Sequence, residues 1–492
     1  MIRRISWVLL GSLCACVAFA REEYTRTFDK TLTLQSGQRV FVENKFGDVT
    51  IRAHAQPDIV IHALIHVSAN DMNQAKSYAD RVEILIEPAS SEISIRTRYP
   101  DTKAGLFNFH NVSYSVRYDI AMPEVAPLEL RNAFGAVMVT GVKASCQITN
   151  SHGDLEFRDG HGTHRLENSF ASVRVHNNSG DVTVDNTNGS VDAGDINGAL
   201  SIRDRFAGIT VGHIAKDVTI INNNGSVVLE DCGGPSNIKN SFGSVTVHNV
   251  RGDLTVNDSN GAVEAAHVDG AAELNTSFGQ VLFSNIGHQL SVRANNSKVE
   301  GQRVGGPLTI QNSFGSVTLT DVGEVRVQSQ NSGVLISNAR GAAEVKTSFG
   351  KVEASDIAGV LSVRNQNGSV KAAHTRGAQV TTSFGAVLLE AIDGPLEVEN
   401  QNGSVDASAN THRQCQPVII HTSFSPIHVR LPNDASYRVT AKTSYAKIRS
   451  DFPLTVSGGL SSDDLAGTIG GGACEMRLTN NNGEIQILRA GF

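Results

Sequence analysis

Aliphatic residues recur at every second position in short runs along most of the chain, and Gly, Asn and Ser separate the runs. Val245 and Val247, followed by Leu254 and Val256, show this spacing. Alternation with a period of two is typical of a strand that buries one face. The pattern therefore predicts an all-β chain built of many short strands.

These strands belong to an internal repeat with two alternating units. One unit reads NSFGSVTV at 240–247 and TSFGQVLF at 276–283, and the other reads NGAVEAAH at 260–267 and QNGSVKAA at 366–373. The residue before the repeat glycine, which we call the marker, alternates between Phe and a polar residue. The markers are Phe134, His152, Phe170, Asn188, Phe206, Asn224, Phe242, Asn260, Phe278, Asn296, Phe314, Ser332, Phe349, Asn367, Phe384 and Asn402. They lie 18 residues apart up to Ser332 and alternately 17 and 18 apart beyond it.

The residue types around the marker indicate the architecture. Gly usually follows the marker, as a corner with positive φ requires, and the third residue after it is Val, Leu or Ile. Asn or Thr recurs two residues before the marker, where we expect it to hydrogen-bond from coil to coil. A short fixed period indicates a solenoid. The sequence thus predicts a single-stranded β-solenoid, a β-helix that we expect to be right-handed.

Two coil sizes fit the repeat. An 18-residue coil would stack each Phe marker on a polar marker, whereas a 36-residue coil would stack Phe on Phe. The fifth residue after the marker alternates in size, as in Val247 and Ala265. This alternation fits either a large residue over a small one in the next coil or two sides of a larger coil. We favour 18 residues, because a larger coil leaves more interior than these side chains can fill.

The two ends depart from the repeat. Residues 21–130 contain one copy, NKFGDVTI at 44–51, together with strand-like runs and one short helix between Ala69 and Val82. Alternation returns at 437–449 and 476–488. Because solenoids need terminal units that cover exposed sheet edges, both ends are expected to be β caps. We therefore divide the chain into a leader (1–20), an N-terminal cap (21–130), regular repeats (131–410) and a C-terminal solenoid end and cap (411–492).

The first twenty residues have the pattern of a signal peptide. Arg3 and Arg4 precede an apolar stretch, and a small-x-small site ends at Ala20. This pattern predicts export to the periplasm, the cell surface or the medium. An alternative is lipoprotein processing at Cys16, which would leave the protein lipid-anchored.

Charge and cysteine content narrow the possibilities further. The net charge is −7, which argues against a nucleic-acid partner, and beyond the leader no apolar stretch is long enough for a membrane span. Four cysteines follow the leader. Cys415 and Cys474 lie in the C-terminal region and would pair in an oxidising compartment, and the alternative is that the cysteines are buried free thiols.

The repeated N-x-F-G-x-V-x-V and N-G-x-V-x-V units, the early NKFGDVTI and the closing run IGGGACEMRLTNNNGEIQIL resemble the bacterial "putative adhesin" domain family. This family occurs in exported and envelope proteins, and its molecular function is unknown. The resemblance covers nearly all of the chain beyond the leader. It implies a β-solenoid, and it offers no catalytic residues to carry over.

Candidate chemistry is sparse. Four residues after the polar markers lie acidic residues, with interruptions at Val228, Ile336 and Lys371. The acidic residues are Glu156, Asp192, Glu264, Glu300 and Asp406. Paired carboxylates could act on a polysaccharide, but an interrupted outward column is better explained as a solvated surface. His161 and His164 are close in sequence but lack a third ligand, so we expect no metal site, no cofactor and no catalytic residues.

The Phe markers form a regular series that has two interpretations. Exposed rings at this spacing could stack on sugars, but their position beside the Asn and Thr residues favours a structural ladder packed in the core or a corner. The series comprises Phe134, Phe170, Phe206, Phe242, Phe278, Phe314, Phe349 and Phe384. On this interpretation Phe278→Ala would destabilise the fold by about 3–5 kcal/mol.

Together these patterns favour an exported, non-catalytic β-solenoid that acts as a cell-envelope interaction or adhesin-like module. Its partners would be envelope glycans or proteins, bound by weak multivalent contacts. The alternative is a periplasmic polysaccharide-active enzyme that uses the outward carboxylate column.

Overall fold

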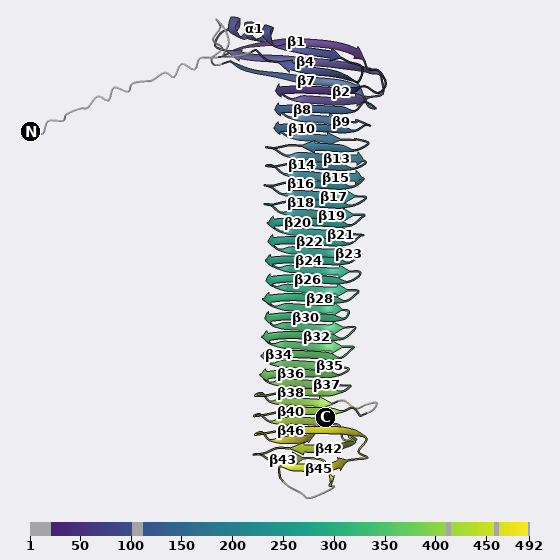
Figure 1. Cartoon of the computed structure of the whole chain (residues 1–492), viewed down its shortest axis with the longest axis vertical. Helices are drawn as coiled ribbons and strands as arrows, with labels where there is room; N and C mark the ends of the chain where they lie inside the picture. Colours follow the sequence, from purple (N-terminus) through teal and green to yellow (C-terminus); the bar gives the residue numbers. More distant parts are fainter. Residues whose placement is uncertain (1–20, 101–111, 410–414, 457–461, 491–492) are drawn as a thin grey trace, which may run out of the picture. The chain divides into compact units, whose positions relative to one another are not determined.

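The computed structural model describes residues 21–100, 112–409, 415–456 and 462–490 (Figure 1). The chain divides into two compact units, residues 1–167 and 168–492. The predicted signal peptide and Cys16 lie outside the described residues. Within the described residues no helix is both long and apolar enough to cross a bilayer.

Unit 1 contains two sheets and one helix. Sheet A is formed by β1 (Glu22–Thr33), β3 (Val49–His54), β4 (Asp58–Ala69), β7 (Ser113–Pro123), β9 (Val137–Thr140) and β11 (Leu155–Arg158). Sheet B is formed by β2 (Arg39–Phe46), β5 (Glu83–Pro88), β6 (Glu92–Arg98), β8 (Leu128–Phe134), β10 (Cys146–His152) and β12 (His164–Glu167).

The N-terminal end of unit 1 is antiparallel, unlike the coils that follow. β4 pairs antiparallel with both β1 and β7, and β3 then pairs parallel with β7 and β9. Helix α1 (Met72–Arg81) packs on β1 and β4. It starts later than predicted because Asp71 caps it, accepting a hydrogen bond from Gln74 N at 2.8 Å.

Unit 2 also has two sheets, which we again call A and B. Sheet A contains β13 (Val173–Ser179), β15 (Val191–Asn197), β17 (Ile209–Ile214), β19 (Val227–Cys232), β21 (Val245–Val250), β23 (Val263–Val268), β25 (Val281–Ile286), β27 (Val299–Val304), β29 (Val317–Val322), β31 (Val334–Ala339), β33 (Val352–Ile357), β35 (Val370–Thr375), β37 (Val387–Ile392), β39 (Val405–Ala409), β41 (Ile427–Leu431), β43 (Ile448–Ser450) and β47 (Ile485–Arg489). Sheet B contains β14 (Val182–Asp185), β16 (Leu200–Arg203), β18 (Val218–Ile221), β20 (Ser236–Phe242), β22 (Leu254–Asn260), β24 (Ala272–Phe278), β26 (Leu290–Asn296), β28 (Leu308–Phe314), β30 (Val325–Asn331), β32 (Ala343–Phe349), β34 (Leu361–Asn367), β36 (Ala378–Phe384), β38 (Leu396–Asn400), β40 (Val418–Thr422), β42 (Tyr437–Lys442), β44 (Thr455–Val456), β45 (Asp464–Ile469) and β46 (Cys474–Asn480).

Each regular coil contributes one strand to each sheet, so the predicted all-β solenoid is confirmed (Figure 1). Val245 in β21 lies beside Val263 in β23, which sets the coil at 18 residues rather than 36. The two faces that meet inside are apolar. Val245, Val247, Leu254 and Val256 are each exposed by no more than 1%.

The large and small inward residues lie beside one another in neighbouring coils, as the first of the two explanations predicted. Phe283 in β25 lies beside Gly301 in β27, and Leu319 follows in β29. A Cβ atom added to Gly301 would overlap the Phe283 ring. Gly301 therefore provides the space that lets the Phe283 ring fit between the two sheets.

The buried Asn residues hold the corners, though not as a side-chain ladder. Asn240 donates its Nδ2 hydrogens to Gly243 O at 2.9 Å and to Gly225 O of the preceding coil at 3.3 Å. Asn400 makes the same two contacts with its own corner and the preceding one. The predicted coil-to-coil bonds thus exist, and their acceptors are mostly backbone carbonyls.

Two register assignments need correction. Asn331, and not Ser332, lies between Phe314 and Phe349, because the coil that follows Phe314 is one residue shorter. For the same reason Leu335 occupies the outward position assigned to Ile336, which is fully buried. With this shift the polar markers of unit 2 between Phe170 and Asn402 are all Asn.

At the C-terminal end, the last coil of the chain inserts between two coils that precede it in the sequence. β46 pairs parallel with both β40 and β42, and β47 pairs with both β41 and β43, so the last coil lies between two earlier ones. β45 then covers the other edge of β42 in antiparallel pairing. Cys415 and Cys474 form a disulfide bond, whereas Cys146 and Cys232 are buried free thiols.

Candidate functional site: a phenylalanine row and an amide groove

The Phe markers lie at corners and not in the core, the two positions that the sequence left open, but their rings point outward and are not packed there. In unit 2 they are exposed by 49% to 62%, and in unit 1 Phe134 is exposed by 42%. We call the unit 2 series the Phe row. It consists of Phe170, Phe206, Phe242, Phe278, Phe314, Phe349, Phe384 and Phe424.

The corner explains this orientation. Alternation along β20 buries Asn240 and would also turn Phe242 inward. The strand ends at Phe242, however, and Gly243 has a φ of 113°, so the backbone leaves the strand path there. A Cβ atom at Gly243 would overlap the Gly225 carbonyl of the preceding coil. Glycine therefore permits the tight corner that leaves the ring in solvent.

Phe424 extends the row and was missed in the sequence. Its backbone N–H donates to Gln401 O, which parallels the bond from Phe242 N to Asn223 O in a regular coil. The chain between Asn402 and Phe424 is longer than one repeat, and Ser425 replaces the usual glycine. Because of this longer spacing and the missing glycine, Phe424 does not fit the repeat pattern in the sequence.

The Phe row has a period of two coils. Phe278 lies beside Asn260 in one neighbouring coil and Asn296 in the other. At about 4.8 Å per coil, successive Phe residues are about 9.6 Å apart. The intervening amides are held in place, since Asn224 donates to Arg205 O at 3.3 Å and Asn260 to Ser241 O at 3.4 Å.

The corner that carries the Phe row is almost uncharged. Taking two residues on each side of every described marker from Phe170 to Phe424, the charged residues are Arg205, Lys298 and Lys351 and the buried Asp204 and Asp258. The other positions are mostly Ser, Thr, Asn, Gln and Gly. The whole chain, by contrast, has 18% charged residues.

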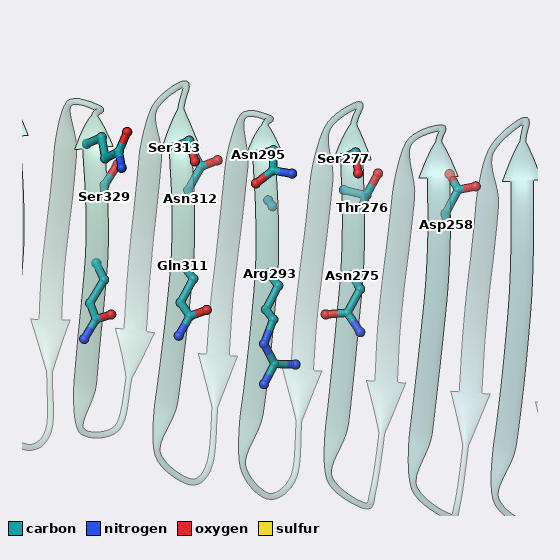
Figure 2. A pocket seen from close by; sticks show the side chains of 13 residues that line it. Asp258, Asn275, Thr276, Ser277, Arg293, Asn295, Gln311, Asn312, Ser313 and Ser329 are labelled. Atoms are coloured by element: carbon teal, nitrogen blue, oxygen red, sulfur yellow. The ribbon is translucent and has the colours of Figure 1, made fainter.

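A shallow groove of about 690 Å³ runs beside the middle of the row, and we call it the amide groove. Figure 2 shows Asn275, Arg293 and Gln311 in one line across neighbouring strands, with Ser277 and Ser313 at the strand ends next to the row. Arg293 forms an ion pair with Glu273, and Asn275 donates to Asn257 Oδ1 at 2.9 Å. The groove is thus lined by oriented amides and hydroxyls.

The acidic residues are placed outward as predicted, but the structure does not gather them into a reactive pair. Glu264 and Glu300 border one small groove of about 330 Å³, two coils apart, with Leu282 between them. Glu300 forms an ion pair with Lys298 at 2.5 Å and accepts a hydrogen bond from Gln280 at 2.9 Å.

The other acidic residues also have partners. Asp192 lies 3.4 Å from His176, Glu264 lies 3.8 Å from His248, and Asp406 lies 2.9 Å from His428. In unit 1, Glu156 forms an ion pair with Arg158. The carboxylates of the column therefore already contact basic or imidazole side chains on the surface.

Of the two histidines considered for a metal site, His164 has a role in the core. His164 is fully buried in unit 1 and packs against Phe157, with ring centroids 4.5 Å apart. Burial, together with nearby His161, lowers the pKa of His164 to about 4. Its ring is therefore neutral at physiological pH and belongs to the core.

A second outward ladder escaped the sequence analysis. Near the end of most regular sheet A strands, a residue adopts a left-handed conformation, as Asn249 does in β21 with a φ of 59°. Asp, Asn and His dominate this position, and they contact one another between coils. His213 lies 3.7 Å from Asp195 and 3.3 Å from Asp231, and Asn249 donates to Asp231 at 2.9 Å. These contacts stabilise the corner.

Comparison with known proteins supports the fold class. Residues 273–488 match the family model described as Toastrack DUF4097, which is less than half of the chain. No curated protein matches the chain significantly. Among solved structures, the chain is similar to a "putative cell adhesion protein" from Clostridium sporogenes ATCC 15579, with 13% identity over 44% of this chain and 100% of that chain. The TM-score of 0.22 is too low for that likeness to bear on function.

Proposed function

We propose that this protein is an exported, non-catalytic β-solenoid that serves as an adhesin-like interaction module of the cell envelope. The Phe row carries this proposal. Eight rings, each about half exposed, follow one almost uncharged corner of unit 2. Apolar residues scattered singly over a surface are normal, but large apolar side chains aligned at a fixed spacing along one corner indicate a surface that binds something.

The repetition of the row suits multivalent binding. Each ring offers a small contact, and the sheets hold all of them at fixed spacing, so a ligand that spans several rings gains affinity without any single strong site. Because the rings lie at corners whose backbone hydrogen-bonds from coil to coil, little backbone entropy is lost on binding.

Two observations support export. The leader pattern ends at Ala20, and the disulfide between Cys415 and Cys474 is the kind of bond that persists in oxidising compartments. Intact-mass analysis of the native protein should give an N-terminus at Arg21. A mass that begins at Cys16 with added acyl chains would instead mean a lipid-anchored protein.

The enzymatic alternative is less well supported. Glu264 and Glu300 lie two coils apart, about 9.6 Å, with Leu282 between them. That spacing is too long for a retaining glycosidase, which needs about 5 Å, and lies at the upper limit for an inverting one. Both carboxylates already have partners, Glu264 in His248 and Glu300 in Lys298 and Gln280. Cleavage of a glycan by the wild-type protein, abolished in the Glu264→Gln/Glu300→Gln variant, would revive this alternative.

The test of the proposed function is co-sedimentation of the purified chain from Arg21 with cell-envelope fractions of the source organism. The row variant is Phe242→Ser/Phe278→Ser/Phe314→Ser. The control variant, Leu335→Ser/Val360→Ser, removes apolar side chains that are exposed by 41% and 49% elsewhere on unit 2. We expect the wild type and the control to sediment with the envelope and the row variant to remain in solution. Equal sedimentation of all three proteins would contradict the proposal.

A further inference from the structure

We infer that the Phe row and the amide groove form a binding site for an extended, uncharged, β-1,4-linked polysaccharide that lies along the stacking direction of the coils. This inference rests on the proposed function and specifies its ligand. It is carried by three observations on unit 2, which are the period of the rings, the polar groups between and beside them, and the lack of charge.

The period of the row matches the geometry of such a chain. Successive sugars in an extended β-1,4-linked polysaccharide are rotated by about half a turn, so the same ring face recurs once per disaccharide. Phe278 and Phe314 are two coils apart, about 9.6 Å, which is close to the length of one disaccharide in such a chain. Each Phe ring could therefore stack against every second sugar, through the apolar C–H face.

The polar groups suit the hydroxyl and amide substituents of sugars. Between the rings lie amides such as Asn260, which uses one N–H group to bond Ser241 O and keeps a second N–H and its carbonyl oxygen for a ligand. Beside the rings, Asn275, Asn295 and Gln311 line the amide groove. Binding sites for small polar ligands combine apolar faces with a few oriented polar groups in this way.

The electrostatics favour an uncharged ligand. Arg293, the one basic residue in the lining of the amide groove, is already paired with Glu273. Asp258, the acidic residue in that lining, is 6% exposed, and burial raises the pKa of its carboxyl. A polyanion would find few unpaired cations here, and a polycation would find few accessible carboxylates.

Other occupants fit less well. A peptide strand cannot extend the sheets at this corner, because the backbone groups there already bond from coil to coil, as Gly225 N does to Phe242 O. A second copy of the chain would cover the rings with its own row. It would leave the amides and hydroxyls of the neighbouring groove without partners, which costs binding energy wherever they are desolvated.

The test is isothermal titration of the chain from Arg21 with the β-1,4-linked hexamer and dimer of N-acetylglucosamine. We expect the hexamer to bind at least tenfold more tightly than the dimer, since it reaches several rings. Phe242→Ala/Phe278→Ala/Phe314→Ala should weaken hexamer binding at least tenfold, and Leu335→Ala/Val360→Ala should leave it within twofold. Phe278→Tyr, which keeps an aromatic face, should bind like the wild type, whereas Phe278→Leu should bind like Phe278→Ala.

The outcomes separate the two proposals. Absence of hexamer binding, or binding that the row variant retains, would overturn the polysaccharide site. If the row variant then still lost its sedimentation with the envelope, the adhesin-like function would stand with a different ligand. A wild-type dimer in sedimentation velocity that the row variant dissociates would overturn the inference in favour of self-association.

Discussion

Asp204 is an exception at a corner position that otherwise requires a hydrogen-bond donor. It occupies the position at which neighbouring coils place Asn186 and Asn222, whose amide groups donate to corner carbonyls. A carboxylate has no hydrogen to donate there. Burial accordingly raises the pKa of Asp204 above its usual range, although the backbone N–H groups of Arg205 and Phe206 oppose part of the shift.

We predict that Asp204→Asn stabilises the protein by about 1–2 kcal/mol at pH 7, because an amide can supply the missing donor. In the folded wild type the pKa of Asp204 is raised above its value in the unfolded chain, which is about 4. The ionised carboxylate therefore lowers the free energy of unfolding at pH values above about 4, and this cost disappears as the pH falls and the group becomes protonated. Denaturant unfolding at pH 7 and pH 4 should therefore show a gain that shrinks at the lower pH. The same gain at both values would mean that the carboxylate is not the cause.

The two phenylalanines Phe278 and Phe283 stand five residues apart and have opposite environments. Phe278 is exposed by 53%, whereas Phe283 is exposed by 3%. We predict that Phe283→Ala destabilises the fold by about 3–5 kcal/mol and Phe278→Ala by less than about 1 kcal/mol. Thermal unfolding of both variants decides the matter. A large loss in Phe278→Ala would restore the packed interpretation that the structure contradicts.

Within an element, neighbouring coils complement one another in volume. The pair Phe283 and Gly301 is the extreme case on β25 and β27, because any side chain on Gly301 would meet the Phe ring. Close-packed interiors tolerate such overlap poorly.

We predict that Gly301→Ala destabilises the protein by about 1–3 kcal/mol, and that Phe283→Leu relieves most of this effect. A double-mutant cycle measured by denaturant unfolding should therefore show strong coupling between the two sites. Additive effects would mean that Gly301 is needed for its backbone and not for the space it leaves.

The strands and the core were predictable because they depend on local periodicity. Val245, Val247, Leu254 and Val256 are read as inward from their spacing alone, and they are buried. The orientation of Phe278 was not predictable in this way, since alternation holds only within a strand and the ring lies where the strand turns into the corner.

Other parts of the site depend on the register between strands of neighbouring coils. One coil that is a residue shorter shifts this register, and the sequence alone does not show where the shift occurs. Treating Ser332 as a marker placed Ile336 outward, and only strand pairing shows that Asn331 and Leu335 hold those positions. The amide groove could not be predicted from the sequence either, because it depends on which residues of different coils lie side by side. Asn275, Arg293 and Gln311 come from different coils and share only an outward position, with no residue type in common.

At the scale of the whole molecule, the repeated coils combine a regular core with one outward corner that differs from the rest of the surface. Because each coil in a solenoid contacts mainly its neighbours, outward residues can change along one corner with little effect on stability. The series of exposed rings from Phe170 to Phe424 would therefore be free to change under selection for binding.

The most direct test of the central claim, that the Phe row contacts an envelope ligand, is site-specific photo-crosslinking. A benzophenone-bearing phenylalanine analogue would replace Phe278 in one protein and Leu335, on the outward face of sheet A, in a second. After irradiation with intact envelope, we expect a covalent glycan adduct at position 278 and none at position 335. Equal adducts at both positions, or none at position 278, would contradict it.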